Sequence, residues 1–81
     1  MPIVLRYKGY SFFFFSNEGN PIEPLHIHVR KGDAIAKFWI KPAVGVAHSH
    51  GLNSNELTEL LGIVEENKKL IERSWHEYFG D

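Results

Sequence analysis

Short runs of β-branched and aromatic residues, separated by turn-forming residues, dominate the first half of the chain. They cover residues 3–7, 10–16, 25–31 and 34–40. Lys8-Gly9 and Gly32-Asp33 each leave two residues between neighbouring runs, which is the spacing of a tight β-hairpin. We therefore predict four antiparallel strands in two hairpins, with residues 17–24 as a loop. Residues 43–47 are the candidate for a short additional edge strand.

After residue 53 the apolar spacing changes to steps of three and four, which is typical of an amphipathic helix. Asn53 and Glu56 fit a capping box at its start, and Gly80 fits a C-cap. Lys68 falls on the apolar stripe, so a break near Asn67 would divide this helix into two. The predicted fold is α+β: an antiparallel sheet of about four strands packed against one long C-terminal helix. The stripe consists of Leu57, Leu60, Leu61, Val64, Ile71, Trp75 and Tyr78.

The second hairpin gives the most informative prediction. If Gly32-Asp33 is its turn, His28 pairs with Lys37, and His26 pairs with Trp39 or its near neighbour. Alternation then separates an apolar face from a polar, basic one, and a one-residue slip would exchange the two. The apolar face holds Leu25, Ile27, Val29, Ala34, Ala36, Phe38 and Ile40, and the polar face holds His26, His28, Arg30, Lys37, Trp39 and Lys41.

The length, net charge and cysteine content of the chain limit the classes of function that it can have. The chain has 81 residues and 9.3 kDa, which fits one domain over residues 1–81 with a modest core. The net charge of -1 provides no overall field that would attract nucleic acid or an anionic membrane. The absence of cysteine excludes disulfides and thiol catalysis, and small secreted domains usually need disulfides. We expect a cytoplasmic protein without a signal peptide or membrane segment.

A metal site is the first interpretation of His26 and His28, because alternate positions on a strand aim two imidazoles the same way. Two ligands do not complete a site, and Lys37 opposite His28 would repel a cation. The candidates for a third ligand are Glu23, His48, His50 and His76. His48 and His50 have the same spacing, but they lie beside Gly51 and are predicted to belong to a loop. We therefore predict no metal and no cofactor.

The second interpretation is acid–base chemistry on a phosphodiester. His26 and His28 would transfer protons, because histidine titrates near neutral pH. Arg30 and Lys37 would hold the phosphate. Trp39 would stack on a base, so the substrate of such an enzyme would be RNA.

The third interpretation is a partner-binding surface. Four consecutive phenylalanines place two rings on each face of the sheet, yet one helix covers only one face. Either the loop over residues 17–24 or a partner must cover the second pair, because large exposed apolar patches usually mark an interface. We favour the partner and predict an interface that includes Phe13, Phe15 and Trp39.

A set of short motifs in fixed order resembles the prokaryotic domain-of-unknown-function family 4160 over almost the entire chain. The resemblance implies little about activity. It does imply pairing of the toxin–antitoxin kind, because members are often encoded beside another small protein. The family usually has prolines just before the first motif histidine, where this chain has Pro24-Leu25. The motifs are Gly9-Tyr10, Phe12-Phe13-Phe14, Ser16-Asn17-Glu18-Gly19, His26-Ile27-His28-Val29, Ala36-Lys37-Phe38-Trp39 and Trp75-His76-Glu77-Tyr78-Phe79. Carried over by position, the motif residues are His26, His28, Lys37, Trp39, Trp75 and His76.

These observations predict a small interaction module of unknown biochemical activity. It would associate with itself or bind a small protein encoded nearby, as a member of a toxin–antitoxin-like pair. The alternative is an RNA-directed toxin that uses the His, Arg, Lys and Trp side chains of the polar sheet face.

Overall fold

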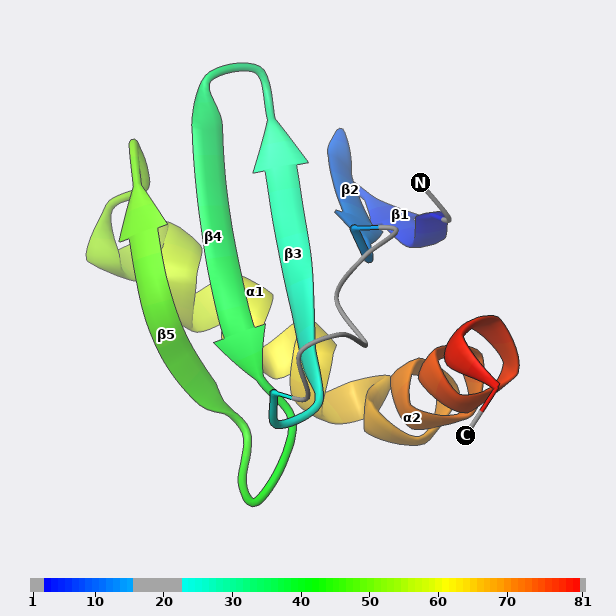
Figure 1. The fold of residues 1–81 in the computed structure, drawn as a ribbon. Coiled ribbons are helices and arrows are strands. Elements are labelled where there is room, and N and C mark those ends of the chain that lie inside the picture. Colours follow the sequence, from blue (N-terminus) through cyan, green and yellow to red (C-terminus); the bar gives the residue numbers. More distant parts are fainter. Residues whose placement is uncertain (1–2, 16–22, 81) are drawn as a thin grey trace.

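The computed structural model describes residues 3–15 and 23–80. One antiparallel sheet with the strand order β1-β2-β3-β4-β5 is followed by two helices (Figure 1). The α+β class is confirmed, but the sheet has five strands where about four were predicted. The elements are β1 (Ile3–Tyr7), β2 (Tyr10–Phe13), β3 (His26–Lys31), β4 (Ala34–Trp39), β5 (Gly45–His50), α1 (Ser54–Glu66) and α2 (Lys68–Phe79).

The two predicted hairpins are present. Lys8 and Gly9 both have positive φ, at 48° and 84°, which is the conformation of a type I′ turn. In the second hairpin His28 pairs with Lys37 and His26 with Trp39, so the predicted register is confirmed. β2 ends at Phe13, three residues before the predicted end of that strand.

The fifth strand corrects the prediction for residues 43–50. β5 begins at Gly45 and continues through His48 and His50, which were predicted to lie in a loop. Its ladder with β4 runs from Trp39↔Gly45 to Ile35↔His50 and shifts register once, beside Ala47. Pairing with the open edge of β4 outweighs the turn-like local composition, because strand formation depends strongly on tertiary context.

The long helix that was predicted is divided into two consecutive helices, and the division lies at Asn67, where a break was anticipated. The Asn67 side chain donates to the carbonyl of Ile63 at 2.8 Å, so this amide competes for a helix carbonyl where α1 ends. The predicted capping box is confirmed, with reciprocal hydrogen bonds of 2.8 and 2.9 Å between Asn53 and Glu56. Gly80 ends α2 in the left-handed conformation with φ 75°.

The core lies between the apolar face of the sheet and the two helices. Figure 1 shows α1 crossing behind β4 and β5, with α2 continuing toward β1 and β2. Of the predicted helix stripe, Leu60, Val64, Ile71 and Trp75 are buried there, Leu57 and Leu61 are partly buried, and Tyr78 is exposed. The core side chains are Tyr10, Phe12, Phe14, Leu25, Ile27, Val29, Ala36, Phe38, Ile40, Leu60, Val64, Ile71 and Trp75. Within the described residues, neither helix is long and apolar enough to cross a membrane.

A surface carboxylate ties the first hairpin to α1. The Tyr7 hydroxyl donates to Glu59, and the Lys8 ammonium lies 3.0 Å from the same carboxylate oxygen. The Tyr7 hydrogen bond, followed by the Lys8 hydrogen bond, lowers the pKa of Glu59 below its ordinary value of 4.5. A carboxyl whose pKa is lower in the folded state stabilises the fold above its unfolded pKa, and that stability is lost as the pH falls through the folded pKa.

We therefore expect Glu59→Gln to be slightly less stable than the wild type at neutral pH, and this difference to shrink below about pH 4.5. The effect is small because all three groups are exposed. Urea denaturation at a series of pH values measures it. Glu66→Gln is the matched control, since Glu66 is exposed and has no hydrogen bond or ion pair with the rest of the described chain. A Glu59→Gln deficit that is the same at every pH would contradict this assignment.

Candidate functional site

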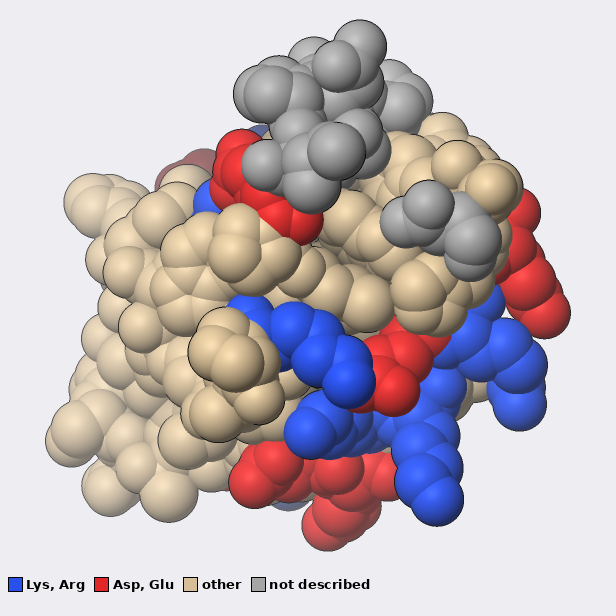
Figure 2. Space-filling view, turned by 60° about the horizontal axis from the view of Figure 1, so that its bottom comes forward, with Lys and Arg blue, Asp and Glu red and all other residues tan. Residues whose placement is uncertain are grey.

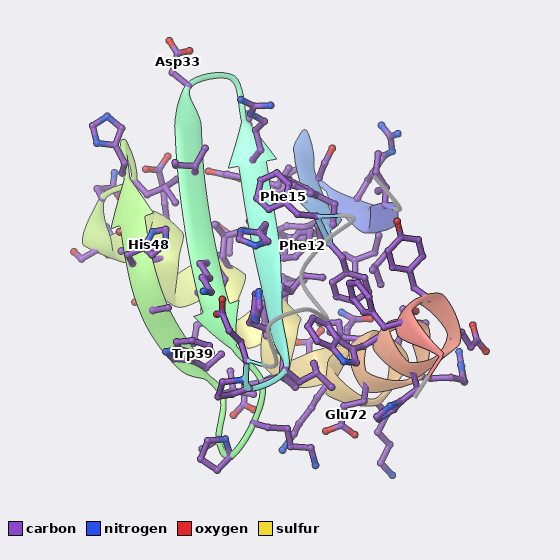
Figure 3. The ribbon with its side chains drawn as sticks, in the orientation of Figure 1. Phe12, Phe15, Asp33, Trp39, His48 and Glu72 are labelled. Carbon is purple, nitrogen blue, oxygen red and sulfur yellow. The ribbon has the colours of Figure 1, made fainter. Side chains whose placement is uncertain are left out.

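The face of the sheet turned away from both helices holds every site residue predicted from the sequence. We call it the open face. Direct cross-strand pairs lie on the same side of a sheet, and one row of such pairs runs Phe13↔His28↔Lys37↔His48. Figure 3 shows Phe15 over β3, with Trp39 and His48 on β4 and β5. The open face consists of Phe13, Phe15, His26, His28, Arg30, Ile35, Lys37, Trp39, His48 and His50.

Lys37 at the centre of the open face has two partners. Its ammonium lies 2.9 Å from the Glu23 carboxylate and 4.6 Å from the centre of the Trp39 ring. The side chain is only 15% exposed. A lysine held between a carboxylate and an indole is poorly placed to take up a phosphate, because the ligand would have to displace Glu23. The structure therefore gives Lys37 a positioning role beside Trp39.

His26 is the only buried polar side chain among the described residues. Its Nδ1 lies 2.8 Å from the carbonyl oxygen of Pro24, which accepts a hydrogen bond from an Nδ1–H. Its ring meets Trp75 of α2 at 5.3 Å and Trp39 at 5.7 Å, measured between centroids. A buried ring that joins β3 to α2 contributes to the fold and has no surface to offer a substrate.

His28 lies one pleat along from His26 and is half-buried. Its ring packs against Phe15 at 4.4 Å and against Phe13 at 5.8 Å, and it lies 5.2 Å from the His26 ring. The structure thus brings the two motif histidines together, but only His28 borders the surface.

The four phenylalanines alternate between the faces as predicted, although only the first two belong to β2. Phe12 and Phe14 are fully buried in the core. On the open face Phe13 is buried at 6% exposure, whereas Phe15 is 41% exposed. The suggestion that the loop over residues 17–24 covers this pair depends mainly on residues 17–22, which lie outside the described part of the chain. Of the predicted interface residues, Phe15 and the half-buried Trp39 have exposed side-chain surface that a partner could contact.

Three members of the open face were not predicted from the sequence. Ile35 is 40% exposed and pairs with Arg30 on one side and His50 on the other. Strand alternation already places Ile35 with Lys37 and Trp39, so that signal was available. His48 and His50 join the face only because β5 pairs with β4. Lys41, predicted for the polar face, instead forms an ion pair with Glu72 of α2 at 3.2 Å.

Other candidate sites are limited. Across residues 3–15 and 23–80, no group of three or more His, Asp or Glu side chains lies close enough to hold a metal ion. A hollow of about 300 Å³ lies between β1 and α2, on another part of the surface. It is lined by Ile3, Val4, Phe14, Ser74, Glu77 and Tyr78.

Comparison with known proteins gives one match. A family profile described as a domain of unknown function (DUF4160) matches residues 9–76. The matched segment begins at Gly9 in the first hairpin turn and contains both motif histidines, Trp39 and Trp75. No curated protein and no solved structure matches the chain.

Proposed function

Because the chain belongs to the DUF4160 family, which is defined without an assigned function, we propose a function from the geometry of the open face. The protein is a small interaction module whose open face binds a partner protein, as one member of a toxin–antitoxin-like pair. One observation carries this proposal. Phe15, Ile35 and Trp39 expose apolar surface around the Lys37–Glu23 pair, on the side of the sheet without a helix.

The composition of the open face suits a protein partner. Aromatic and large aliphatic anchors near the centre of an interface, with polar groups around them, are typical of protein–protein binding sites. Here Phe15 and Ile35 are 41% and 40% exposed, and Trp39 is oriented by Lys37. Arg30 and His50 lie beside Ile35 and would form part of the polar rim.

The same geometry weakens the case for catalysis. The acid–base interpretation needs both His26 and His28 at the substrate, yet His26 is fully buried and binds the Pro24 carbonyl. Phosphate binding by Lys37 would require breaking its ion pair with Glu23. Protein binding requires neither change, which is why we favour it.

Replacing an anchor should weaken partner binding. We expect Phe15→Ser and Trp39→Ser each to cost about 2 kcal/mol, or roughly a 30-fold increase in Kd, which is typical of aromatic hot spots. Isothermal titration calorimetry with the product of the neighbouring gene measures the change.

Tyr78→Ser is the matched control, because Tyr78 is 43% exposed and lines the hollow between β1 and α2. It should bind the partner as the wild type does. Loss of binding in Tyr78→Ser with retention in both open-face variants would contradict the proposal and place the partner at the hollow.

RNA binding is the second candidate function. Phe15 packs against the half-buried His28, and Trp39 and the exposed Arg30 lie on the same face of the antiparallel sheet. Proteins that bind single-stranded RNA often stack bases on aromatic side chains of such a sheet. If this candidate is right, expression of the wild type arrests growth and Arg30→Ala with His28→Ala relieves the arrest. Equal arrest by the double variant would exclude a role for the open face in toxicity.

A further inference from the structure

Among the strands that the structure describes, β5 is the last of the sheet and pairs with β4 alone, so its outer edge has no described strand beside it. In residues 3–15 and 23–80, no backbone hydrogen bond joins this edge to another element. An edge strand presents a row of backbone donors and acceptors that a further strand can pair with. Val46 and Ile35 add exposed apolar surface next to this edge, at 42% and 40% exposure.

β5 also lacks the charges that usually protect an edge. Residues 42–55 contain no Lys, Arg, Asp or Glu. The other edge strand, β1, carries Arg6, is followed by Lys8, and contacts α2. Figure 2 shows charged side chains of both signs gathered toward α2, while the side that carries β5 has few in this view. Natural proteins commonly keep edge strands apart with lysine or proline, so β5 is the less protected edge.

We infer that two copies of this chain join by antiparallel pairing of β5 with β5 of the second copy. Charge favours a second copy as the occupant. In a two-fold symmetric pair, β5 of one copy faces β5 of the other. A charge in β5 would therefore lie near the same charge in the second copy. The uncharged segment 42–55 avoids this repulsion.

The pairing has a defined geometry. The two-fold axis of an antiparallel strand pair is perpendicular to the sheet, so the copies would form one continuous sheet with five strands from each. Both open faces would then lie on the same side, and both helix layers on the other. The inference deepens the binding function proposed above, because it joins two partner-binding faces into one surface.

The dimer should be weak. A pairing of six-residue strands buries less than the roughly 1,200–2,000 Å² of a standard stable interface. The shift of register beside Ala47 also bends the strand and shortens its regular part. Association should therefore depend on concentration, and the dimer should appear only in the upper part of a concentration series.

Sedimentation equilibrium over concentrations up to millimolar tests the inference. We expect the wild-type mass to rise from 9.3 kDa toward twice that value. Ser49→Lys should increase the dimer Kd by at least about tenfold, because a charged side chain would have to lie against Val46 of the second copy on an otherwise uncharged edge. Ser49→Thr leaves the strand uncharged and should associate as the wild type does. Val46→Lys serves as a second variant if circular dichroism shows that Ser49→Lys does not fold.

Cross-linking gives an independent readout, because the chain has no cysteine. When all six residues pair, Ser49 faces Val46 of the second copy, so an equimolar mixture of Val46→Cys and Ser49→Cys should form an intermolecular disulfide under mild oxidation. A mixture of Ser74→Cys and Ser49→Cys should not. A wild-type monomer at every concentration would overturn the inference. So would a dimer that persists in both lysine variants but is lost in Phe15→Ser, and that result would leave binding by the open face intact.

Discussion

Phe14→Ala is expected to unfold a large fraction of the protein. The Phe14 ring is fully buried and packs against Trp75, Tyr78 and Phe79 of α2, with centroid distances of 5.3, 6.5 and 5.9 Å. Truncating a buried phenylalanine typically costs about 3–5 kcal/mol. That loss is comparable with the whole stability of a small domain, at roughly 0.05–0.15 kcal/mol per residue.

The neighbouring ring is the matched control for this result. Phe15 is 41% exposed on the opposite face, so Phe15→Ala should change the free energy of unfolding by less than about 1 kcal/mol. Urea denaturation followed by far-UV circular dichroism measures both variants. Similar losses from the two substitutions would contradict the alternation of faces on which the open face depends.

His26→Ala should be strongly destabilising, lowering the free energy of unfolding by about 2–4 kcal/mol. Two losses combine in this variant. The fully buried imidazole leaves a cavity between Trp39 and Trp75, and the Pro24 carbonyl loses its donor. Denaturation in urea at neutral pH gives the value.

Two comparisons separate a structural role of His26 from a chemical one. His26→Asn keeps a side-chain N–H near the position of Nδ1 and should recover part of the lost stability. His28→Ala removes a half-buried ring and should cost clearly less than His26→Ala. If His26→Ala kept wild-type stability while removing a biological effect of the protein, the structural assignment of His26 would be wrong.

The part of the open face built on β3 and β4 was predictable because one short turn determines it. Once Gly32-Asp33 is taken as the turn, every cross-strand pair from Lys31↔Ala34 to His26↔Trp39 follows, and the structure has that register. Apart from Ile35, which was not assigned, the side chains of β3 and β4 were therefore placed correctly on the two faces from the period of two. The capping box and the C-terminal glycine were also predictable, because each depends on the chemistry of residues close together in the sequence.

Other features depend on contacts that no local pattern contains. His48 and His50 lie beside a glycine, in a sequence typical of a loop. They form a strand because they pair with β4. His26 alternates with core residues and should have been exposed, yet Trp75 from α2 reaches its ring. Glu23 was considered as a metal ligand, whereas in the structure its carboxylate pairs with Lys37.

The two proposals concern different surfaces of the same sheet. The open face offers aromatic anchors to a partner, and the β5 edge offers an uncharged strand to a second copy. Variants at Phe15 and Trp39 test the first surface, and variants at Ser49 and Val46 test the second. Because these sites are separate, their effects should be independent, and a double variant should lose both partner binding and self-association.

The two tryptophans allow the most direct test of the central claim that a partner binds the open face. Trp39 lies on this face and is half-buried, whereas Trp75 is buried in the core, so the chain has one indole reporter in each place. Nuclear magnetic resonance would follow the two indole N–H signals while the product of the neighbouring gene is added. We predict that the Trp39 signal shifts with saturation while the Trp75 signal changes much less. Saturable binding that leaves the Trp39 signal unchanged would contradict this assignment of the binding surface.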